Sequence, residues 1–157
     1  MAEERRDVYT AVRMYSVEHH TGRLIEVKLT SPLMPSDVQE FVQKHLAIMQ
    51  QIPGKYIGVV NLLEAYVFPA NVAQTLSQML SGAASHVERT ALLIGESAVF
   101  GLQVERVIRD ANNPNRRVFR NPREMVAWLS EILTPAEQRR LEQFVHDSVL
   151  PHKQKSA

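Results

Sequence analysis

The 157-residue sequence contains no cysteine, few aromatic residues and almost no net charge. The absence of cysteine excludes disulfides, thiolate metal sites and a cysteine nucleophile, and it fits the reducing cytoplasm in which we expect the protein to act. A formal net charge of +1 at pH 7 creates no field that would attract nucleic acid or an acidic membrane. No apolar run approaches the roughly 20 residues that a membrane span requires. We therefore predict neither a nucleic-acid partner nor a membrane span.

The sequence does contain a regular alternation of strand and helix patterns within the length of one domain. Strands are predicted over residues 12–17, 24–29, 56–62, 89–94 and 118–119. Helices follow each of the last four strands, and a final helix extends to about Leu150. The order ββαβαβαβαα predicts an α/β fold with a mixed, mostly parallel sheet of about five strands and helices on its faces. The first strand should be an antiparallel edge, and the last three should be parallel and central.

These patterns divide the chain into four segments. Residues 1–8 are predicted to be a flexible leader, and residues 9–133 the α/β domain. Residues 134–150 form an extra amphipathic C-terminal helix, and residues 151–157 a flexible tail. Residues 19–22 are predicted to be the hairpin loop between the first two strands, with Gly22 at a positive φ.

Turn and capping residues mark the helix starts. Ser36 with Gln39 and Thr134 with Glu137 have the spacing of capping boxes, and Asn121 precedes Pro122 at the start of another helix. The helix that follows strand 56–62 is predicted to begin at Pro69 or Asn71. In strand 24–29, apolar and charged residues interleave, so we expect some of the residues Leu24, Glu26 and Lys28 to face outward.

Few residues are arranged for catalysis. Ser97 lies in Gly95-Glu-Ser-Ala-Val99, at a strand-to-helix turn that resembles a nucleophile elbow, but Val99 replaces its second glycine. We interpret Ser97 as a helix N-cap, with a serine hydrolase as the alternative. The six histidines show no metal-binding spacing, and His45 lies on the apolar stripe of its helix, which indicates a partly buried, hydrogen-bonded histidine. We predict no catalytic residue, metal or cofactor.

Six arginines between residues 106 and 123 give a local excess of positive charge. Their pattern favours a solvated rim, with a surface for a protein or an anionic ligand as the alternative; it lacks the breadth of a nucleic-acid surface. The six are Arg106, Arg109, Arg116, Arg117, Arg120 and Arg123.

Two apolar segments are candidate contact surfaces. The connection after strand 56–62 is unusually apolar, and it either binds a partner or ligand or packs over the sheet. Its candidate residues are Tyr66, Val67, Phe68, Pro69 and Asn71. The C-terminal helix has an apolar stripe that either covers the sheet or mediates self-association as a homodimer. The stripe consists of Leu141, Phe144, Val145 and Val149.

The segments 56–61 (YIGVVN), 89–95 (RTALLIG) and 118–129 (VFRNPREMVAWL) resemble the STAS-like family, the bacterial anti-anti-sigma factors and related regulators, and most closely its SpoIIAA-like branch. Met125 stands where the branch has alanine, and the resemblance covers about residues 12–133. It implies a non-enzymatic bacterial regulatory or protein-interaction module with a protein partner. Because some SpoIIAA-like members resemble lipid-binding folds, the alternative is a carrier or sensor of an apolar small molecule such as a lipid, with a pocket between residues 63–80 and the sheet.

The phosphorylation switch of this family is not inherited. Its aspartate falls on Asn61, and its phosphorylated hydroxyl falls near residues 69–72, Pro-Ala-Asn-Val, where no hydroxyl stands. Phosphorylation acts through the charge it adds to that one group. We therefore expect a module that binds without this switch.

Overall fold

The computed structural model describes residues 13–112 and 114–156, with side chains through residue 150. The predicted leader, the start of the first predicted strand and the side chains of the predicted tail lie outside the described residues. The elements follow the predicted order. They are β1 (Tyr15–Thr21), β2 (Leu24–Leu29), α2 (Pro35–Gln51), β3 (Tyr56–Asn61), α3 (Ala70–Gly82), the 3-10 turn η1 (Ala84–His86), β4 (Val87–Leu93), α4 (Ala98–Asp110), β5 (Arg116–Phe119), α5 (Pro122–Ser130) and α6 (Pro135–Ser156).

The sheet has the strand order β1-β2-β3-β4-β5, so every strand lies beside its neighbour in the sequence. β1 pairs antiparallel with β2, and β2, β3, β4 and β5 run parallel. The α/β class, the mixed sheet and the antiparallel edge strand are confirmed. The prediction that the last three strands are central is wrong for β5, which forms the second edge, while β2 joins the parallel set.

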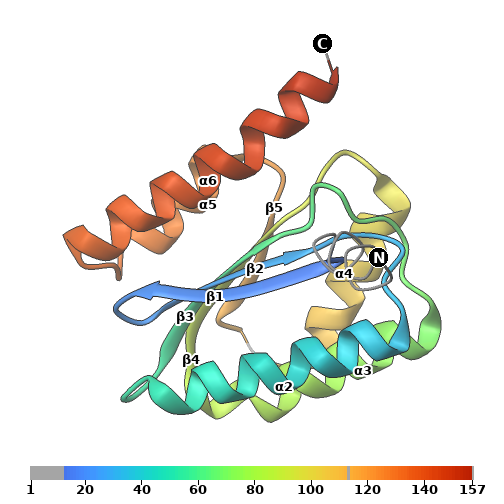
Figure 1. The fold of residues 1–157 in the computed structure, drawn as a ribbon, viewed down its shortest axis with the longest axis horizontal. Helices are drawn as coiled ribbons and strands as arrows, with labels where there is room; N and C mark the ends of the chain where they lie inside the picture. The colour runs from blue at the N-terminus through green and yellow to red at the C-terminus, as the bar shows by residue number, and fades with distance from the viewer. Residues whose placement is uncertain (1–12, 113, 157) are drawn as a thin grey trace, which may run out of the picture.

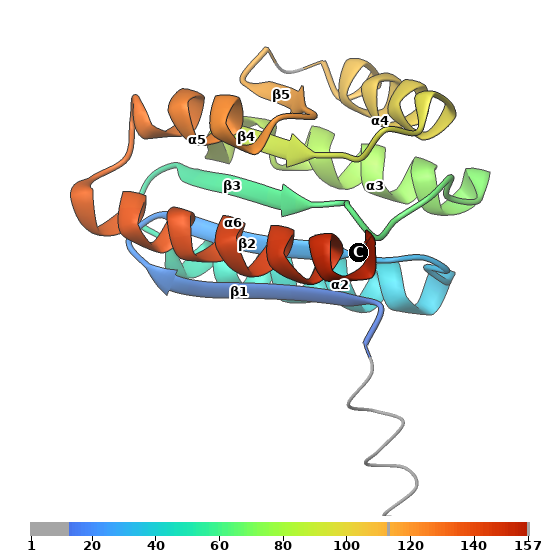
Figure 2. The same ribbon diagram turned by 90° about the horizontal axis from the view of Figure 1, so that it is seen from above.

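Helices cover both faces of this sheet (Figure 1). α2, α3 and α4 pack on one face, and we call this the α2/α3/α4 face; α5 and α6 pack on the other, the α5/α6 face. Seen from above, α6 lies over the β1–β3 side of the sheet and α5 lies beside it (Figure 2). Because side chains alternate along a strand, each parallel strand contributes one set of residues to each core.

Several helix starts agree with the sequence. Ser97 caps α4 by accepting a hydrogen bond from the Phe100 amide, and Asn121 caps α5. Thr134 and Glu137 form the predicted reciprocal capping box, with N···O distances of 2.9 and 3.2 Å. The prediction for α2 is wrong. That helix begins at Pro35, and the Asp37 carboxylate accepts from the Met34 amide, so Ser36 and Gln39 lie inside the helix. A proline at the first helical position has no amide hydrogen that needs a partner.

The hairpin is tighter than predicted because β1 continues through Thr21. Gly22 has the expected positive φ, +57°. A Cβ at Gly22 would also collide with the Glu137 carboxylate, so the turn needs glycine for space as well as for conformation.

The outward positions predicted in β2 are a second correction. Leu24 and Glu26 are buried, because α6 lies over them and Arg140 of α6 donates two hydrogen bonds to the Glu26 carboxylate, at 2.7 and 2.8 Å. A carboxylate can be buried in this position because the guanidinium pairs with it.

Candidate functional site

A cavity of about 60 Å³ lies between the sheet and the helices of the α2/α3/α4 face. Strands β2, β3 and β4 form its floor, and α2, α3, α4 and Phe68 form its walls. The lining is apolar apart from His45, Tyr56 and Thr90. Protein interiors pack to nearly crystalline density and contain few voids larger than a water molecule, so this apolar space is a candidate ligand site.

One row of paired residues crosses four strands, and its first three members, Ile25, Gly58 and Thr90, line the floor of the cavity. In the register, Ile25 of β2 pairs with Gly58 of β3, Gly58 pairs with Thr90 of β4, and Thr90 pairs with Arg116 of β5. Paired residues direct their side chains to the same face of the sheet. A Cβ on Gly58 would lie 2.9 Å from the Thr90 hydroxyl oxygen, so the glycine leaves space in the middle of the row.

Arg116 is the charged end of this row. The side chain is 5% exposed, which contradicts its assignment to a solvated rim. Its Nη2 donates to the Leu80 carbonyl near the end of α3, whereas Nε and Nη1 are buried without a hydrogen-bond partner. Burial lowers the pKa of Arg116, and the nearby Tyr56 phenol group offsets part of this effect. The hydroxyl of Thr90 is also buried without a partner.

His45 and Tyr56 form the aromatic part of the same region. The His45 ring lies between Phe41 and Tyr56, with ring centroids 5.9 and 5.3 Å away. Burial, followed by the charge of Arg116, lowers the pKa of His45 to about 4, so this imidazole is neutral at pH 7. The sequence predicted a partly buried core-edge residue, and the structure buries His45 to 5% exposure.

The predicted contact loop divides into an outer and an inner part. Tyr66 and Val67 are 57% and 45% exposed, and Pro69 and Asn71 are exposed as well. Phe68 is buried, with its ring 5.4 Å from that of Phe100, so it lines the cavity and is not part of the exposed loop surface. Its backbone amide and carbonyl are both held by the Gln103 side chain at 2.8 Å, which fixes the ring against the cavity.

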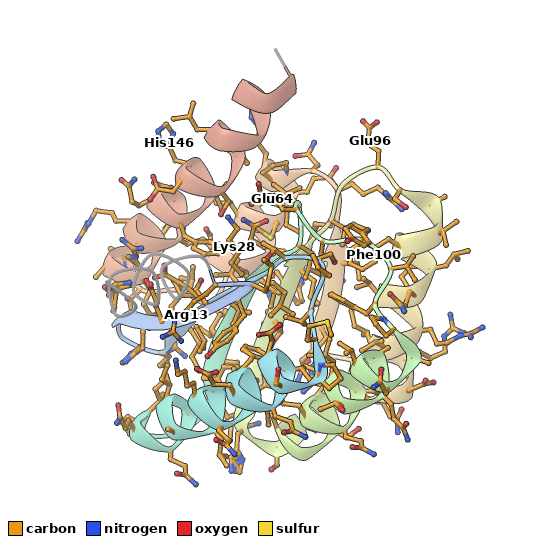
Figure 3. The ribbon with its side chains drawn as sticks, turned by 45° about the vertical axis from the view of Figure 1, so that its right-hand side comes forward. Arg13, Lys28, Glu64, Glu96, Phe100 and His146 are labelled. Carbon is orange, nitrogen blue, oxygen red and sulfur yellow. The ribbon has the colours of Figure 1, made fainter. Side chains whose placement is uncertain are left out.

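Hydrogen bonds and one ion pair tie this loop to the end of β2. The Ser31 hydroxyl donates to the Tyr66 carbonyl and accepts from the Tyr66 amide. Lys28 and Glu64 form an ion pair of 2.7 Å, and they lie close together in Figure 3. The starts of α2 and α4 follow the parallel strands β2 and β4, so they lie at this same edge of the sheet. They carry further apolar side chains that are more than half exposed, namely Met34, Val99 and Leu102.

The apolar stripe of α6 is mainly part of the monomer core. Leu141 is fully buried, and Phe144 and Val145 pack partly buried against the α5/α6 core; Val149 is partly buried. Leu141 therefore cannot offer a surface to a second copy, which corrects its assignment as a self-association residue.

The remaining sequence candidates are structural or exposed. Asn61 is buried at the end of β3, where its side-chain oxygen accepts from the Leu63 amide. Glu96 projects outward from the turn before α4 (Figure 3). Among the described residues, no group of three or more metal-ligating side chains comes together, and none of the helices combines the length and hydropathy needed to span a bilayer.

The sequence did not single out Arg116, Thr90 and Gly58 as a group. A usable signal was present, because Arg116 precedes Val118 by two residues and thus shares its face of the strand. The predicted strand covered only the apolar pair Val118 and Phe119, so it started too late and left Arg116 in a loop.

Comparison with known proteins identifies the fold. No family model matches the chain, and neither does any curated protein. Among solved structures, an uncharacterised protein of the DUF3478 family from Shewanella loihica PV-4, with a SpoIIAA-like fold, superposes with a TM-score of 0.59. The match covers 75% of this chain and 95% of that one at 10% sequence identity. The chain therefore has a SpoIIAA-like fold, as the resemblance implied, and at this identity the likeness carries no function.

Proposed function

We propose that this protein is a non-enzymatic binding module that holds a small apolar molecule in the cavity under α2 and α3. One observation carries the proposal: an apolar space lies between residues of α3 and the sheet, in the position expected for a pocket. Sites for small molecules are typically concave and apolar, with a few polar groups that orient the ligand. Thr90, Tyr56 and His45 supply such groups here.

A binding role fits the polar groups better than catalysis does. General acid–base chemistry needs a titratable group matched to the operating pH. Burial raises the pKa of Tyr56 and lowers that of His45, which moves both groups away from neutrality. Ser97 serves as the cap of α4 and accepts from the Phe100 amide. The hydrolase alternative predicts labelling of Ser97 by a fluorophosphonate, and we expect none.

Native mass spectrometry of protein purified from cells tests the apolar-ligand proposal, together with NMR titration with 1-butanol. We expect a retained small molecule or saturable binding, with shifts centred on Gly58 and Thr90. Leu76→Phe adds volume from α3 into the cavity and should abolish binding at a stability cost of about 1–3 kcal/mol. Leu46→Phe, on an exposed position of α2, is the matched control. A wild-type protein that is empty from cells and does not bind butanol would reject the proposal, whether or not Leu76→Phe folds.

A second candidate is the protein-interaction role, in the form of a bacterial regulatory module. The observation that favours it is the set of exposed apolar side chains at one end of the molecule, which includes Tyr66 and Val67. A pull-down with Tyr66→Ala and Val67→Ala should lose the partner, while Leu46→Ala should keep it. Equal capture by all folded variants would exclude this surface. A cytoplasmic location and a homodimer stay predictions.

A further inference from the structure

Arg116 is a buried charge without a counter-charge. The ion pairs among the described residues engage Arg13, Arg23, Arg89, Arg140 and two lysines, and none of them involves Arg116. Burying an ionised group away from water is costly unless a charge and hydrogen bonds compensate for it. Arginine stays protonated in proteins, so Arg116 cannot avoid this cost by losing its proton.

A structural role explains only part of the side chain. Donation from Nη2 to the Leu80 carbonyl places a positive charge near the C-terminal end of α3, which is a favourable position for a cation. That role leaves two nitrogens, Nε and Nη1, buried without a well-formed hydrogen bond. The Tyr56 phenol interacts with Arg116, but burial raises its pKa, so it is neutral and supplies no counter-charge. Buried polar atoms without partners are rare in folded proteins, and two on one guanidinium point to a missing acceptor.

The unused donors lie beside the cavity. Thr90, which pairs with Arg116 across the β4–β5 ladder, lines the cavity, and so does Leu80, which accepts from Nη2. The Thr90 hydroxyl is a third buried group without a partner. One of the unpaired groups, Thr90, therefore lines the almost entirely apolar cavity, and Arg116 adjoins it on the neighbouring strand.

We propose that the cavity binds a short aliphatic carboxylate, with its carboxylate on Arg116 and Thr90 and its alkyl tail against the apolar lining. This rests on the proposed apolar-ligand function and names the chemical class of the ligand. A carboxylate supplies both the negative charge and the hydrogen-bond acceptors that Arg116 lacks. The cavity of about 60 Å³ is small, which favours a short aliphatic tail.

The decisive comparison is between butanoate and butanamide, which share the tail and the shape of the head but differ in charge. Both are titrated into the full-length protein at constant ionic strength and followed by the amide signals of Gly58 and Thr90. We expect wild type to bind butanoate at least tenfold more tightly than butanamide. Sodium chloride alone should not reproduce the shifts, because chloride has no tail.

Two variants locate the head group. Arg116→Met keeps an unbranched side chain without the charge and should bind both compounds equally. Arg117→Met is the matched control on the other face of β5, where the exposed Arg117 stacks over Trp128, and it should keep the wild-type preference. Thr90→Val should weaken butanoate binding several-fold.

The outcomes separate the two proposals. Equal binding of butanoate and butanamide by wild type, or a preference that survives in Arg116→Met, overturns the carboxylate inference and leaves the apolar-ligand function standing. A response to chloride equal to that to butanoate overturns it as well, since the site would then hold an inorganic anion. If wild type binds neither organic compound, the proposed function itself fails. The wild-type comparison decides even if Arg116→Met does not fold.

Discussion

The two faces of the sheet differ in whether their buried charged side chains have partners of opposite charge. On the α5/α6 face, Glu26 is 3% exposed and receives two hydrogen bonds from Arg140, and Glu137 receives hydrogen bonds from Arg23 and from the Thr134 amide. On the α2/α3/α4 face, Arg116 is similarly buried, next to a cavity, and two of its nitrogens have no partner.

The difference fits a structural role for the α5/α6 face and the proposed ligand-binding role for the α2/α3/α4 face. A paired and closely packed face stabilises the fold, because each buried charge is compensated within the chain. A face with unfilled space and unused hydrogen-bond donors sacrifices stability, which is what a ligand site requires of its scaffold. The following predictions test this difference between the two faces.

The largest effect should come from Leu141→Ala, on the packed face. Leu141 of α6 is fully buried against the sheet side of this core, so its truncation should lower the free energy of unfolding by about 2–5 kcal/mol. Leu150→Ala, at an exposed position of the same helix, should change it by less than about 0.5 kcal/mol. Urea denaturation measures both. Equal, small effects would mean that α6 does not belong to the monomer core.

The next effect should come from Arg140→Met, which removes the partner of a buried carboxylate. Glu26 would stay buried and unpaired, at a cost of about 2–3 kcal/mol. The neighbouring Arg139→Met is the control, because Arg139 is exposed. A loss no larger than that of the control would show that the pairing on this face adds nothing to stability.

A pH effect of about 2 kcal/mol should arise from His45 on the cavity face. Its pKa is about 4 in the folded protein and 6.5 when unperturbed, so between these values the unfolded chain binds more protons. The contribution of the neutral, buried His45 to the free energy of unfolding is therefore fully present above pH 6.5. It is lost as the pH falls toward 4, with a slope approaching about 1.4 kcal/mol per pH unit. Denaturant titrations at pH 7 and pH 5 measure it. His45→Phe should remove this slope, and an unchanged slope would assign it to other groups.

The smallest effect should come from Arg116→Met. Because no carboxylate among the described residues pairs with Arg116, removing its charge affects only neutral groups, the Leu80 carbonyl and the Tyr56 phenol. The free energy of unfolding should therefore change by less than about 1 kcal/mol. Comparison with Arg140→Met, the same substitution on the opposite face, measures the contrast directly. A loss as large as that of Arg140→Met would place an unrecognised partner beside Arg116.

Local chemistry made much of the fold predictable. The apolar pattern of 56–61 and the caps at Ser97, Asn121 and Thr134 depend on residues close in sequence, and the structure confirms them. The prediction failed where a distant segment changed the environment. Glu26 appeared to face outward because its partner, Arg140, is 114 residues away in the sequence.

The candidate site was predictable only in outline. The position of a pocket near α3 followed from a resemblance, and the exposed Tyr66 and Val67 followed from an unusually apolar loop. Phe68 was placed with them because composition does not distinguish an exposed loop residue from one held inward by a distant side chain such as Gln103.

The sequence by itself determined the order of strands and helices, the main helix caps and the absence of cysteine chemistry, because these depend on composition and on neighbours within a few residues. Only the tertiary structure decided that α6 closes one face with paired charges, whereas Gly58, Thr90 and Arg116 meet beside a cavity on the other. The physical reason is that burial and charge pairing depend on strand register and helix packing, which bring together residues from separate parts of the chain.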